Sequence, residues 1–434
     1  MGEPQIRVDS RFTPYQAAFL RRFAEIMAPG RSFLLLAPVG SGKSFAVAGT
    51  VAELLRLDRL RRVLVLGPAA LTAQWAVLAG KWDQRLVTVD ARCLRVLLQD
   101  VGDSSEWDPG WYAASIDFAK RPDVRDALCS QHWDLVVVDE AHRISGQRAS
   151  LVEGLRRGPG EPGMLFLTSF SEGTPPADDL IDWSADAAAY LASRAPRAAV
   201  SRADLPWHRN EEEQALARRV IEYAKAVGEQ AGMMLVHRAS SSIAALEKTL
   251  ARQAALDGAS EAEPLLEQVE ELGVDSKLSR LREWLGSSET PTSAPVVIYT
   301  EYRDTLDYLV ANVADDGHSC MALHGGMDPL ERSSVVDEFR RSGGILVTTA
   351  AEGVSLSFVG HAVHYDLPLQ PVTYAQRIGR YDRFGRTAPC SVWILRDESG
   401  AVPFEEVLHR IVDKVEVIGA NLDLDEGLLW RAVE

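Results

Sequence analysis

The chain has 434 residues, which is more than one hydrophobic core usually serves, so we expect two or three domains. Hydrophobic residues make up 46% and charged residues 25% of the sequence, which is typical of a globular protein and excludes disordered and collagen-like architectures. The net charge of −16 at first discourages a nucleic-acid partner, because phosphate binding requires cations.

The acidic charge is concentrated in two stretches. Residues 254–275 hold seven acidic residues and no Lys or Arg, and residues 411–434 hold six acidic residues against two basic ones. The rest of the chain carries a net charge of only −5, so a local basic groove for nucleic acid stays compatible with the composition. The two acidic stretches are typical of solvated surfaces or of elements that face a partner protein.

Cysteine usage and the absence of targeting signals indicate a cytoplasmic location. The four cysteines are widely separated and form no CxxC pair, which argues against a disulfide framework and against a zinc cluster. No apolar run approaches the roughly 18 residues that a membrane span requires. The N-terminus also lacks the basic-then-apolar pattern of a signal peptide.

Short β-rich apolar runs alternate with helical patterns in two blocks, which predicts an α/β fold with two parallel sheets flanked by helices. In the first block we expect strands at 33–36, 63–66, 135–138 and 164–167. In the second block we expect strands at 296–300, 320–323, 345–348, 362–364 and 391–395.

The segment between the blocks has no strand signals and contains a long helical pattern over 211–227, which predicts a helical linker or insertion. The second block opens with a helix that Asp275 or Ser276 should cap. We therefore divide the chain into a first lobe at 1–202, a helical segment at 203–275 and a second lobe at 276–434.

A glycine-rich loop follows the first predicted strand. The sequence runs through Ala37-Pro-Val-Gly-Ser-Gly-Lys-Ser44 into an apolar helix, which is the order of a P-loop. Such a loop turns backbone N–H groups toward phosphate oxygens, and Lys43 would bridge the β and γ phosphates while Ser44 ligates Mg²⁺. The alternative is an ordinary turn before a helix. The predicted nucleotide contacts are Val39, Gly40, Ser41, Gly42, Lys43 and Ser44.

Two carboxylates, Asp139 and Glu140, follow the predicted strand 135–138. Ligands of open α/β sheets bind at the carboxyl ends of the strands. Asp139 would hold Mg²⁺ there, and Glu140 would polarise the attacking water. An acidic turn that caps a helix is the alternative, but such a turn does not require an upstream P-loop. The two elements together predict hydrolysis of a nucleoside triphosphate.

A third element lies in the second block, where Gln376, Arg380 and Arg383 would share one helical face at i, i+4 and i+7. Two guanidiniums that project together suit a triphosphate, because they stabilise charge that develops on the γ phosphate. A basic surface helix with salt bridges is the alternative. Use of Arg380 and Arg383 as catalytic fingers requires the two lobes to face each other across one ATP molecule.

These motifs together resemble helicase superfamily two. Within it they resemble the Swi/Snf-type DNA translocases, especially the bacterial branch that contains the RNA polymerase recycling ATPase. The resemblance implies two RecA-like lobes, ATP and Mg²⁺ as cofactors, and movement along duplex DNA. One element departs from the family pattern, since the third motif reads Leu167-Thr-Ser and reaches Thr174-Pro175 only after an intervening stretch.

Further segments carry the same resemblance and imply additional contacts. Phe12-Thr-Pro-Tyr-Gln16 is similar to the opening motif of the family, in which Gln16 would read adenine. The segment 63–75 resembles motif Ia, and segments 298–306, 323–332 and 348–356 resemble later motifs of the second lobe. The implied nucleic-acid contacts are Gln74, Thr300, His324, Gly325 and Thr349, and Gly353 and Gln376 would contact the nucleotide.

The leading hypothesis is a DNA-stimulated ATPase that moves along duplex DNA and remodels protein–DNA complexes. A superfamily-two helicase that acts on RNA or branched DNA shares the same motif chemistry. A third hypothesis is a slow, ATP-controlled assembly subunit that docks a protein through the acidic insert or tail. We interpret Trp75, Trp82 and Trp133 as core packing rather than as platforms for bases.

Overall fold

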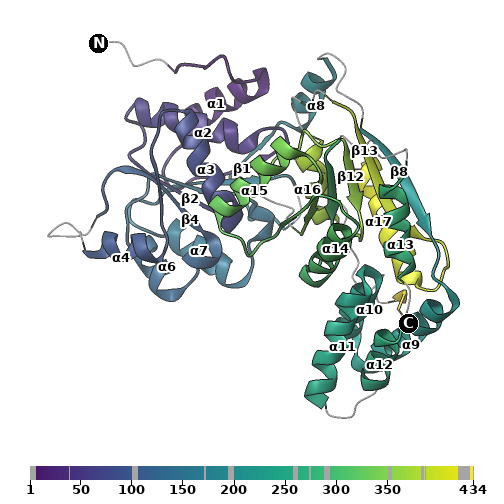
Figure 1. Cartoon of the computed structure of the whole chain (residues 1–434). Coiled ribbons are helices and arrows are strands. Elements are labelled where there is room, and N and C mark those ends of the chain that lie inside the picture. The colour runs from purple at the N-terminus through teal and green to yellow at the C-terminus, as the bar shows by residue number, and fades with distance from the viewer. Residues whose placement is uncertain are drawn as a thin grey trace. The chain divides into compact units, whose positions relative to one another are not determined.

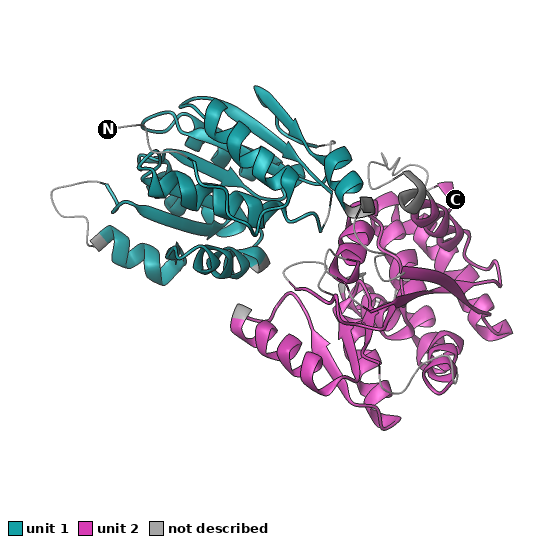
Figure 2. Ribbon diagram, turned by 90° about the horizontal axis from the view of Figure 1, so that it is seen from above, with its two compact units in different colours: residues 1–195 teal, residues 196–434 magenta. Residues whose placement is uncertain are grey.

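The computed structural model describes residues 6–38, 40–99, 106–170, 173–193, 200–257, 262–272, 275–287, 294–349, 354–382, 386, 388–418 and 431–433. The chain divides into two compact units, Met1–Ala195 and Pro196–Glu434, which are coloured separately in Figure 2. Each unit is built around one parallel β-sheet.

The sheet of unit 1 has seven strands in the order β3-β4-β2-β5-β6-β1-β7, and every strand pairs in parallel (Figure 1). The strands are β1 Ser32–Leu36, β2 Arg62–Gly67, β3 Leu86–Thr88, β4 Gly110–Ser115, β5 Leu135–Val138, β6 Gly163–Thr168 and β7 Asp179–Asp182. The helices are α1 Pro14–Ile26, α2 Lys43–Arg56, α3 Ala69–Lys81, α4 Ala91–Gln99, α5 Ile116–Ala119, α6 Pro122–Cys129, the short 3-10 helix Ala141–Arg143, α7 Gly146–Arg156 and α8 Ser184–Ser193.

Helices cover both faces of this sheet, because alternate side chains of each strand point in opposite directions. Val63 and Val65 of β2 pack with α1, α2 and α3, whereas Leu64 and Leu66 pack with α6 and α7. Figure 1 shows α1 and α2 on one side of the strands and α6 and α7 on the other. Strands buried on both faces read as continuous apolar runs, which is why β2 and β5 were predictable.

The sheet of unit 2 has six parallel strands in the order β10-β11-β9-β12-β13-β8. The strands are β8 Val200–Trp207, β9 Val296–Tyr299, β10 Cys320–Leu323, β11 Ile345–Thr348, β12 His361–His364 and β13 Cys390–Asp397. The helices are α9 Glu211–Val227, α10 Glu229–Ser241, α11 Ile243–Asp257, α12 Ala262–Glu270, α13 Ser276–Leu285, α14 Arg303–Asp315, α15 Pro329–Ser342, α16 Pro371–Tyr381 and α17 Pro403–Ile418.

Helices α9 to α12 gather at one end of unit 2 (Figure 1). Leu216, Leu235 and Leu250 of this group share a hydrophobic core with Phe404 and Leu408 of α17. The helical segment therefore shares a hydrophobic core with unit 2 and packs as part of that unit.

Buried polar contacts reinforce this attachment. Ser241 at the end of α10 donates its hydroxyl proton to Asp366, and His237 lies 2.8 Å from the carbonyl oxygen of Leu367. Both acceptors follow β12, a central strand of the sheet. Because buried polar groups are costly to separate, these contacts tie the helical segment firmly to the sheet of unit 2.

The comparison with the sequence-based expectations confirms the α/β class with two parallel sheets. All nine predicted strands occur, and α9 spans the predicted range 211–227. The expectation that 203–275 lacks strands is wrong at its start, because residues 203–207 belong to β8, which pairs with β13. Strands β3, β4 and β7 were not predicted. Asp275 caps α13 by accepting from the Leu278 N–H, as expected.

Among the described residues, none of the helices has the length and apolar character that crossing a membrane requires.

Candidate active site

Three neighbouring strands of unit 1 end beside one another and carry the predicted catalytic segments. Strands β5, β6 and β1 are adjacent in the sheet, with Val138 paired to Phe166 and Leu36 paired to Thr168. Since the strands are parallel, their carboxyl ends lie along one edge of the sheet. The glycine-rich loop, the Asp139–Glu140 pair and Ser169 therefore meet at that edge.

The glycine-rich loop has the backbone geometry of an anion site. Gly40 and Gly42 adopt φ values of +79° and +82°, a left-handed conformation that favours glycine. Gly42 is the N-cap of α2, which begins at Lys43. The positive end of this helix therefore faces the place where a phosphate would bind.

Three side chains brace the loop through Ser41. The Ser41 carbonyl oxygen accepts from the Tyr15 hydroxyl at 2.9 Å and from Gln16 Nε2 at 3.1 Å. The Trp183 indole donates to Ser41 Oγ at 3.3 Å. Gln16 Oε1 also accepts from the Thr13 N–H at 3.0 Å, so both ends of this amide are engaged within unit 1. Adenine contact by Gln16 stays a prediction.

The two polar side chains at the start of α2 face the strand ends. Lys43 donates to the Ala37 carbonyl oxygen at 3.2 Å and to the Ser169 hydroxyl. Ser44 donates to Asp139 Oδ2 at 3.3 Å. The structure thus brings together four of the predicted site residues, Lys43, Ser44, Asp139 and Glu140. The remaining loop residue, Val39, lies outside the described residues.

The carboxylate pair after β5 occupies a buried and strained position. Asp139 is 4% exposed, and burial together with the charge of Glu140 raises its pKa to about 6, against the opposing effect of Lys43. Glu140 adopts a φ of +54°, unusual for a residue with a side chain. Such strain is found most often at functional sites.

His142 completes this cluster. Its Nδ1 lies 3.5 Å from Glu140 Oε2 and 3.4 Å from Thr168 Oγ1. Burial lowers the pKa of His142 to about 4, so the imidazole is neutral at pH 7. A neutral imidazole can orient Glu140 or Thr168 through a hydrogen bond without adding charge. The contact with Thr168 Oγ1 gives His142 a hydrogen-bonding role in the cluster.

The site contains one donor that sequence reasoning missed. The Trp75 indole donates to Asp139 Oδ2 at 3.0 Å. Trp75 is also part of the core, as expected. Nothing in the sequence pattern links the two residues, since a tryptophan on an apolar helical face predicts burial and not a hydrogen-bond partner.

The described residues fit a nucleoside triphosphate with Mg²⁺. A Cβ added at Gly42 would lie 2.6 Å from Gln16 Nε2, so the loop needs glycine to keep its shape. Asp139 and Ser44 offer two hard oxygen ligands, and a dication would offset the repulsion that raises the pKa of Asp139. Within the described ranges, no three His, Cys, Asp or Glu side chains cluster to hold a metal. Phosphate oxygens and water would complete the Mg²⁺ shell.

In unit 2, α16 carries two of the three predicted triphosphate contacts. Gln376 and Arg380 lie on this helix and are buried. The Arg380 guanidinium donates to the Val354 carbonyl oxygen at 3.5 Å. The helix ends at Tyr381, and the placement of Arg383 on the same face as Gln376 and Arg380 stays a prediction. Arg383 itself, like Gly353, lies outside the described residues.

Two other arginines of this region hold the fold of unit 2. Arg377 is 1% exposed and donates to the carboxylate of Glu301 and, at 3.0 Å, to the Asp366 carbonyl oxygen. Arg386 donates to four carbonyl oxygens, those of Ser357, Val359, Tyr381 and Pro389. Arg377 and Arg386 therefore make structural contacts within unit 2. The spacing of the basic residues in the sequence does not distinguish them from the arginines predicted to contact the triphosphate.

The predicted nucleic-acid contacts differ in their surroundings. Thr300 is fully buried and donates to Asp366 Oδ2 at 2.6 Å. Gly325 is exposed, and Gln74, His324 and Thr349 are partly exposed. Burial lowers the pKa of His324, which favours its neutral form. A nucleic-acid contact by any of the five residues stays a prediction.

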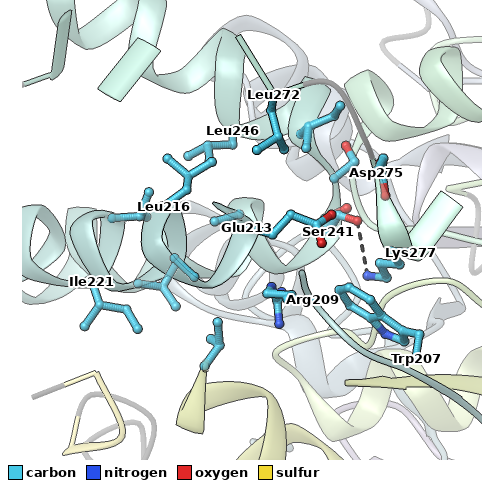
Figure 3. A pocket seen from close by; sticks show the side chains of 17 residues that line it. Trp207, Arg209, Glu213, Leu216, Ile221, Ser241, Leu246, Leu272, Asp275 and Lys277 are labelled. Atoms are coloured by element: carbon cyan, nitrogen blue, oxygen red, sulfur yellow. Dashed lines mark hydrogen bonds between the residues drawn. The ribbon is translucent and has the colours of Figure 1, made fainter. Parts of the chain in front are cut away.

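Unit 2 also contains a pocket between β8 and the helices α9, α10 and α11 (Figure 3). Its charged side chains form hydrogen bonds with other residues of the same chain. Arg209 donates to Glu405 at 2.6 Å, Glu213 accepts from the Ser276 N–H at 2.8 Å, and Lys277 donates to the Ser241 carbonyl oxygen at 3.2 Å. The remaining wall is mainly apolar, so these residues support the attachment of the helical segment.

Two family models match the chain. The helicase conserved C-terminal domain matches residues 276–385, and the type III restriction enzyme res subunit matches residues 9–157. A solved helicase domain, that of Hef from Pyrococcus furiosus, has a TM-score of 0.53 with 18% identity and covers 89% of this chain and 96% of that chain. The fold is thus that of a helicase with two RecA-like domains.

Similar proteins of known sequence agree with this class. The ATP-dependent helicase YqhH of Bacillus subtilis is 23% identical, with an alignment that covers 93% of this chain and 78% of that protein. The ATP-dependent RNA helicase DBP5 of Scheffersomyces stipitis is 36% identical over 126 residues, which is 27% of this chain. Eukaryotic initiation factor 4A of Zea mays is 36% identical over 137 residues, which is 31% of this chain and 33% of that protein.

The match to DBP5 spans only 24% of that protein's length. The two domain matches nevertheless indicate a superfamily 2 helicase. Helicase domains of this kind hydrolyse ATP and bind nucleic acid. The fold and the two domain matches make the residue cluster of unit 1 a candidate site for ATP.

Proposed function

We propose that the protein is an ATP-driven motor of the Swi/Snf type, which moves along duplex DNA and displaces or remodels bound proteins. The observation that carries this proposal is the cluster of Lys43, Ser44, Asp139 and Glu140 at one edge of the unit 1 sheet. A cluster of this kind hydrolyses ATP, and the helicase C-terminal match at 276–385 supports conversion of that energy into movement.

The residues of unit 1 divide the chemical work. The N–H groups that follow Gly40 and Gly42, with the N-terminus of α2, hold the phosphates. Lys43 leaves the Ala37 carbonyl oxygen and Ser169 to contact the β and γ phosphates. Ser44 and Asp139 would hold Mg²⁺, and the ion would supply positive charge that offsets the charge of the phosphate oxygens.

Glu140 orients the attacking water and accepts its proton. Its backbone conformation places the carboxylate at the end of β5, where Glu140 Oε2 lies 3.5 Å from Nδ1 of the neutral His142. A base that is held in place contributes typically 10²- to 10⁴-fold to a rate. Arg380 and Arg383 stabilise charge on the γ phosphate in this proposal.

Nucleic acid binds mainly through its phosphates, since the predicted contacts are small or polar residues and backbone amides. Gln74, Thr300, His324, Gly325 and Thr349 are the residues proposed to supply these contacts. Little dependence on base sequence follows. The acidic residues of α12 and its end, Glu263, Glu267, Glu270 and Glu271, are exposed and suit a basic protein partner.

An RNA substrate is the second candidate. The similarity to DBP5 and initiation factor 4A favours it, because DBP5 is named an RNA helicase and both matches exceed 30% identity over part of the chain. The alignment with YqhH covers most of the chain, but the name of that protein does not specify a nucleic acid.

Parallel ATPase assays with duplex DNA, single-stranded DNA and RNA test the proposal. We expect duplex DNA to give the largest stimulation of ATP hydrolysis. Rising salt should reduce this stimulation steeply, because the logarithm of the DNA-binding constant falls with the logarithm of the salt concentration, with a slope of about 0.9 per neutralised phosphate. Stimulation by RNA alone would select the RNA helicase. ATP hydrolysis that no nucleic acid raises, but that a protein partner does, would select the assembly subunit.

A further inference from the structure

Trp75 joins the hydrophobic core of unit 1 to the candidate metal site. Its side chain is 1% exposed, and its indole nitrogen lies 3.0 Å from Asp139 Oδ2. A buried indole N–H usually finds a partner, but here the partner is the carboxylate that the proposed function assigns to Mg²⁺. The contact joins residues that are 64 positions apart in the sequence.

The order of the sheet brings these two residues together. Strands β2 and β5 are neighbours, and the Asp139 N–H donates to the Leu66 carbonyl oxygen at 2.7 Å. Helix α3 follows β2 after Pro68 and carries Trp75 in its second turn. The indole therefore reaches Asp139 from the helix that follows the neighbouring strand β2.

The indole ring is held firmly in this place. Trp75 and Trp111 pack edge to face, with ring centroids 6.2 Å apart and an interplanar angle of 65°. Both rings belong to the core that α1, α2 and α3 form with the sheet. Side chains in such a core occupy fixed rotamers, so the position of the donor is fixed as well.

The hydrogen bonds of Asp139 leave its carboxylate little rotational freedom. Oδ1 accepts from the Glu140 N–H at 3.0 Å, and Oδ2 accepts from both Trp75 and Ser44. The bonds to Oδ2 come from two different helices, α3 and α2. Of these two donors, Ser44 is itself a predicted metal ligand and Trp75 is not.

We propose that Trp75 is a positioning residue of the metal site, whose indole N–H holds the Asp139 carboxylate in the orientation that binds Mg²⁺. This inference rests on the proposed function, because it requires Mg²⁺ at Ser44 and Asp139. Hydrogen-bond partners of metal ligands typically contribute 10- to 100-fold to metal affinity or activity. The indole has this effect without touching the nucleotide.

Equilibrium binding of N-methylanthraniloyl-ADP, measured in excess Mg²⁺ and in EDTA, tests the proposal. The ratio of the two dissociation constants gives the contribution of Mg²⁺ without any turnover. For Trp75→Phe we expect an affinity in EDTA within about twofold of wild type and a Mg²⁺ contribution reduced about tenfold or more. Reduced volume in the core leaves the metal-free affinity unchanged, because the phosphate-binding loop is retained.

Trp111→Phe is the matched control. It removes the same volume from the same core, and Trp111 Nε1 is buried without a hydrogen-bond partner among the described residues. We expect this variant to keep the full Mg²⁺ contribution. An equal reduction in both variants, or an unchanged ratio in Trp75→Phe, would overturn the proposal and reduce Trp75 to a packing residue.

Two further results are informative. If Trp75→Phe does not fold, the same titration is run with 3-benzothienyl-alanine at position 75, which keeps the ring shape and lacks the N–H. We expect the same loss there, and an unchanged Mg²⁺ contribution contradicts the proposal. If wild-type protein binds the probe no better with Mg²⁺ than with EDTA, the proposed function fails first, and this inference fails with it.

Discussion

Replacement of Gly42 by alanine tests the geometry of the phosphate-binding loop. Gly42 has a φ of +82°, and an added Cβ would lie 2.6 Å from Gln16 Nε2. The left-handed backbone costs a residue with a side chain roughly 1–2 kcal/mol. Displacement of the Gln16 amide costs about 1 kcal/mol more, since its hydrogen bond to the Ser41 carbonyl oxygen is lost.

We therefore expect Gly42→Ala to lower the free energy of unfolding of unit 1 by about 2–3 kcal/mol. We also expect ADP to bind at least about tenfold more weakly, because the N–H groups at the start of α2 are displaced from the phosphates. Chemical denaturation, monitored at the transition that ADP shifts, measures the first quantity, and isothermal titration with ADP measures the second.

Gly146→Ala is the matched control for backbone strain. Gly146 also has a positive φ, +51°, but no atom lies within 4 Å of an added Cβ. This variant should lose about 1–2 kcal/mol and keep its affinity for ADP. Equal ADP affinity in Gly42→Ala and wild type would refute the assignment of the loop. Equal stability losses in the two variants would refute the role of the Gln16 contact.

Two further predictions concern buried charges. The stability of nucleotide-free Asp139→Asn relative to wild type should rise by up to about 3 kcal/mol between pH 3 and pH 8. The folded pKa near 6 exceeds the unfolded value of 3.8, so ionisation of the wild-type carboxyl favours the unfolded chain as pH rises between these values. The gain should fall to about half near pH 5, and a thermal-unfolding gain independent of pH would contradict it. Arg386→Met leaves four carbonyl oxygens without their donor and should lower the free energy of unfolding of unit 2 by at least about 3 kcal/mol. ADP binding should be kept. A loss below about 1 kcal/mol, measured by chemical denaturation, would contradict this prediction.

Much of the arrangement of the candidate nucleotide site could be predicted because its signals are local. The glycine-rich loop and the Asp139–Glu140 pair each follow a short apolar run, and such runs mark strands of a parallel sheet. Parallel strands place their carboxyl ends at one edge, so both segments were expected at the same edge of the sheet. The bounds of α9 and the cap of α13 were predictable for the same reason, because capping and helical periodicity are local.

The remaining features depend on contacts between distant residues. Strand β8 has mostly exposed side chains, so its sequence lacks the buried apolar run that revealed the central strands. The hydrogen bond from Trp75 to Asp139 depends on strand order, which periodicity does not specify. Burial of Arg377 and Arg386 likewise depends on carbonyl groups that lie in separate loops of unit 2. A basic helical segment with surface salt bridges would have the same composition.

Steady-state ATP hydrolysis by purified Glu140→Gln protein, compared with wild type at saturating Mg²⁺ and duplex DNA, tests the central claim most directly. The glutamine keeps the volume of the side chain but cannot accept the proton of the attacking water. We expect turnover to fall at least about 100-fold while ADP binding and thermal stability stay near wild type. Undiminished hydrolysis in this variant would contradict the assignment of the catalytic site.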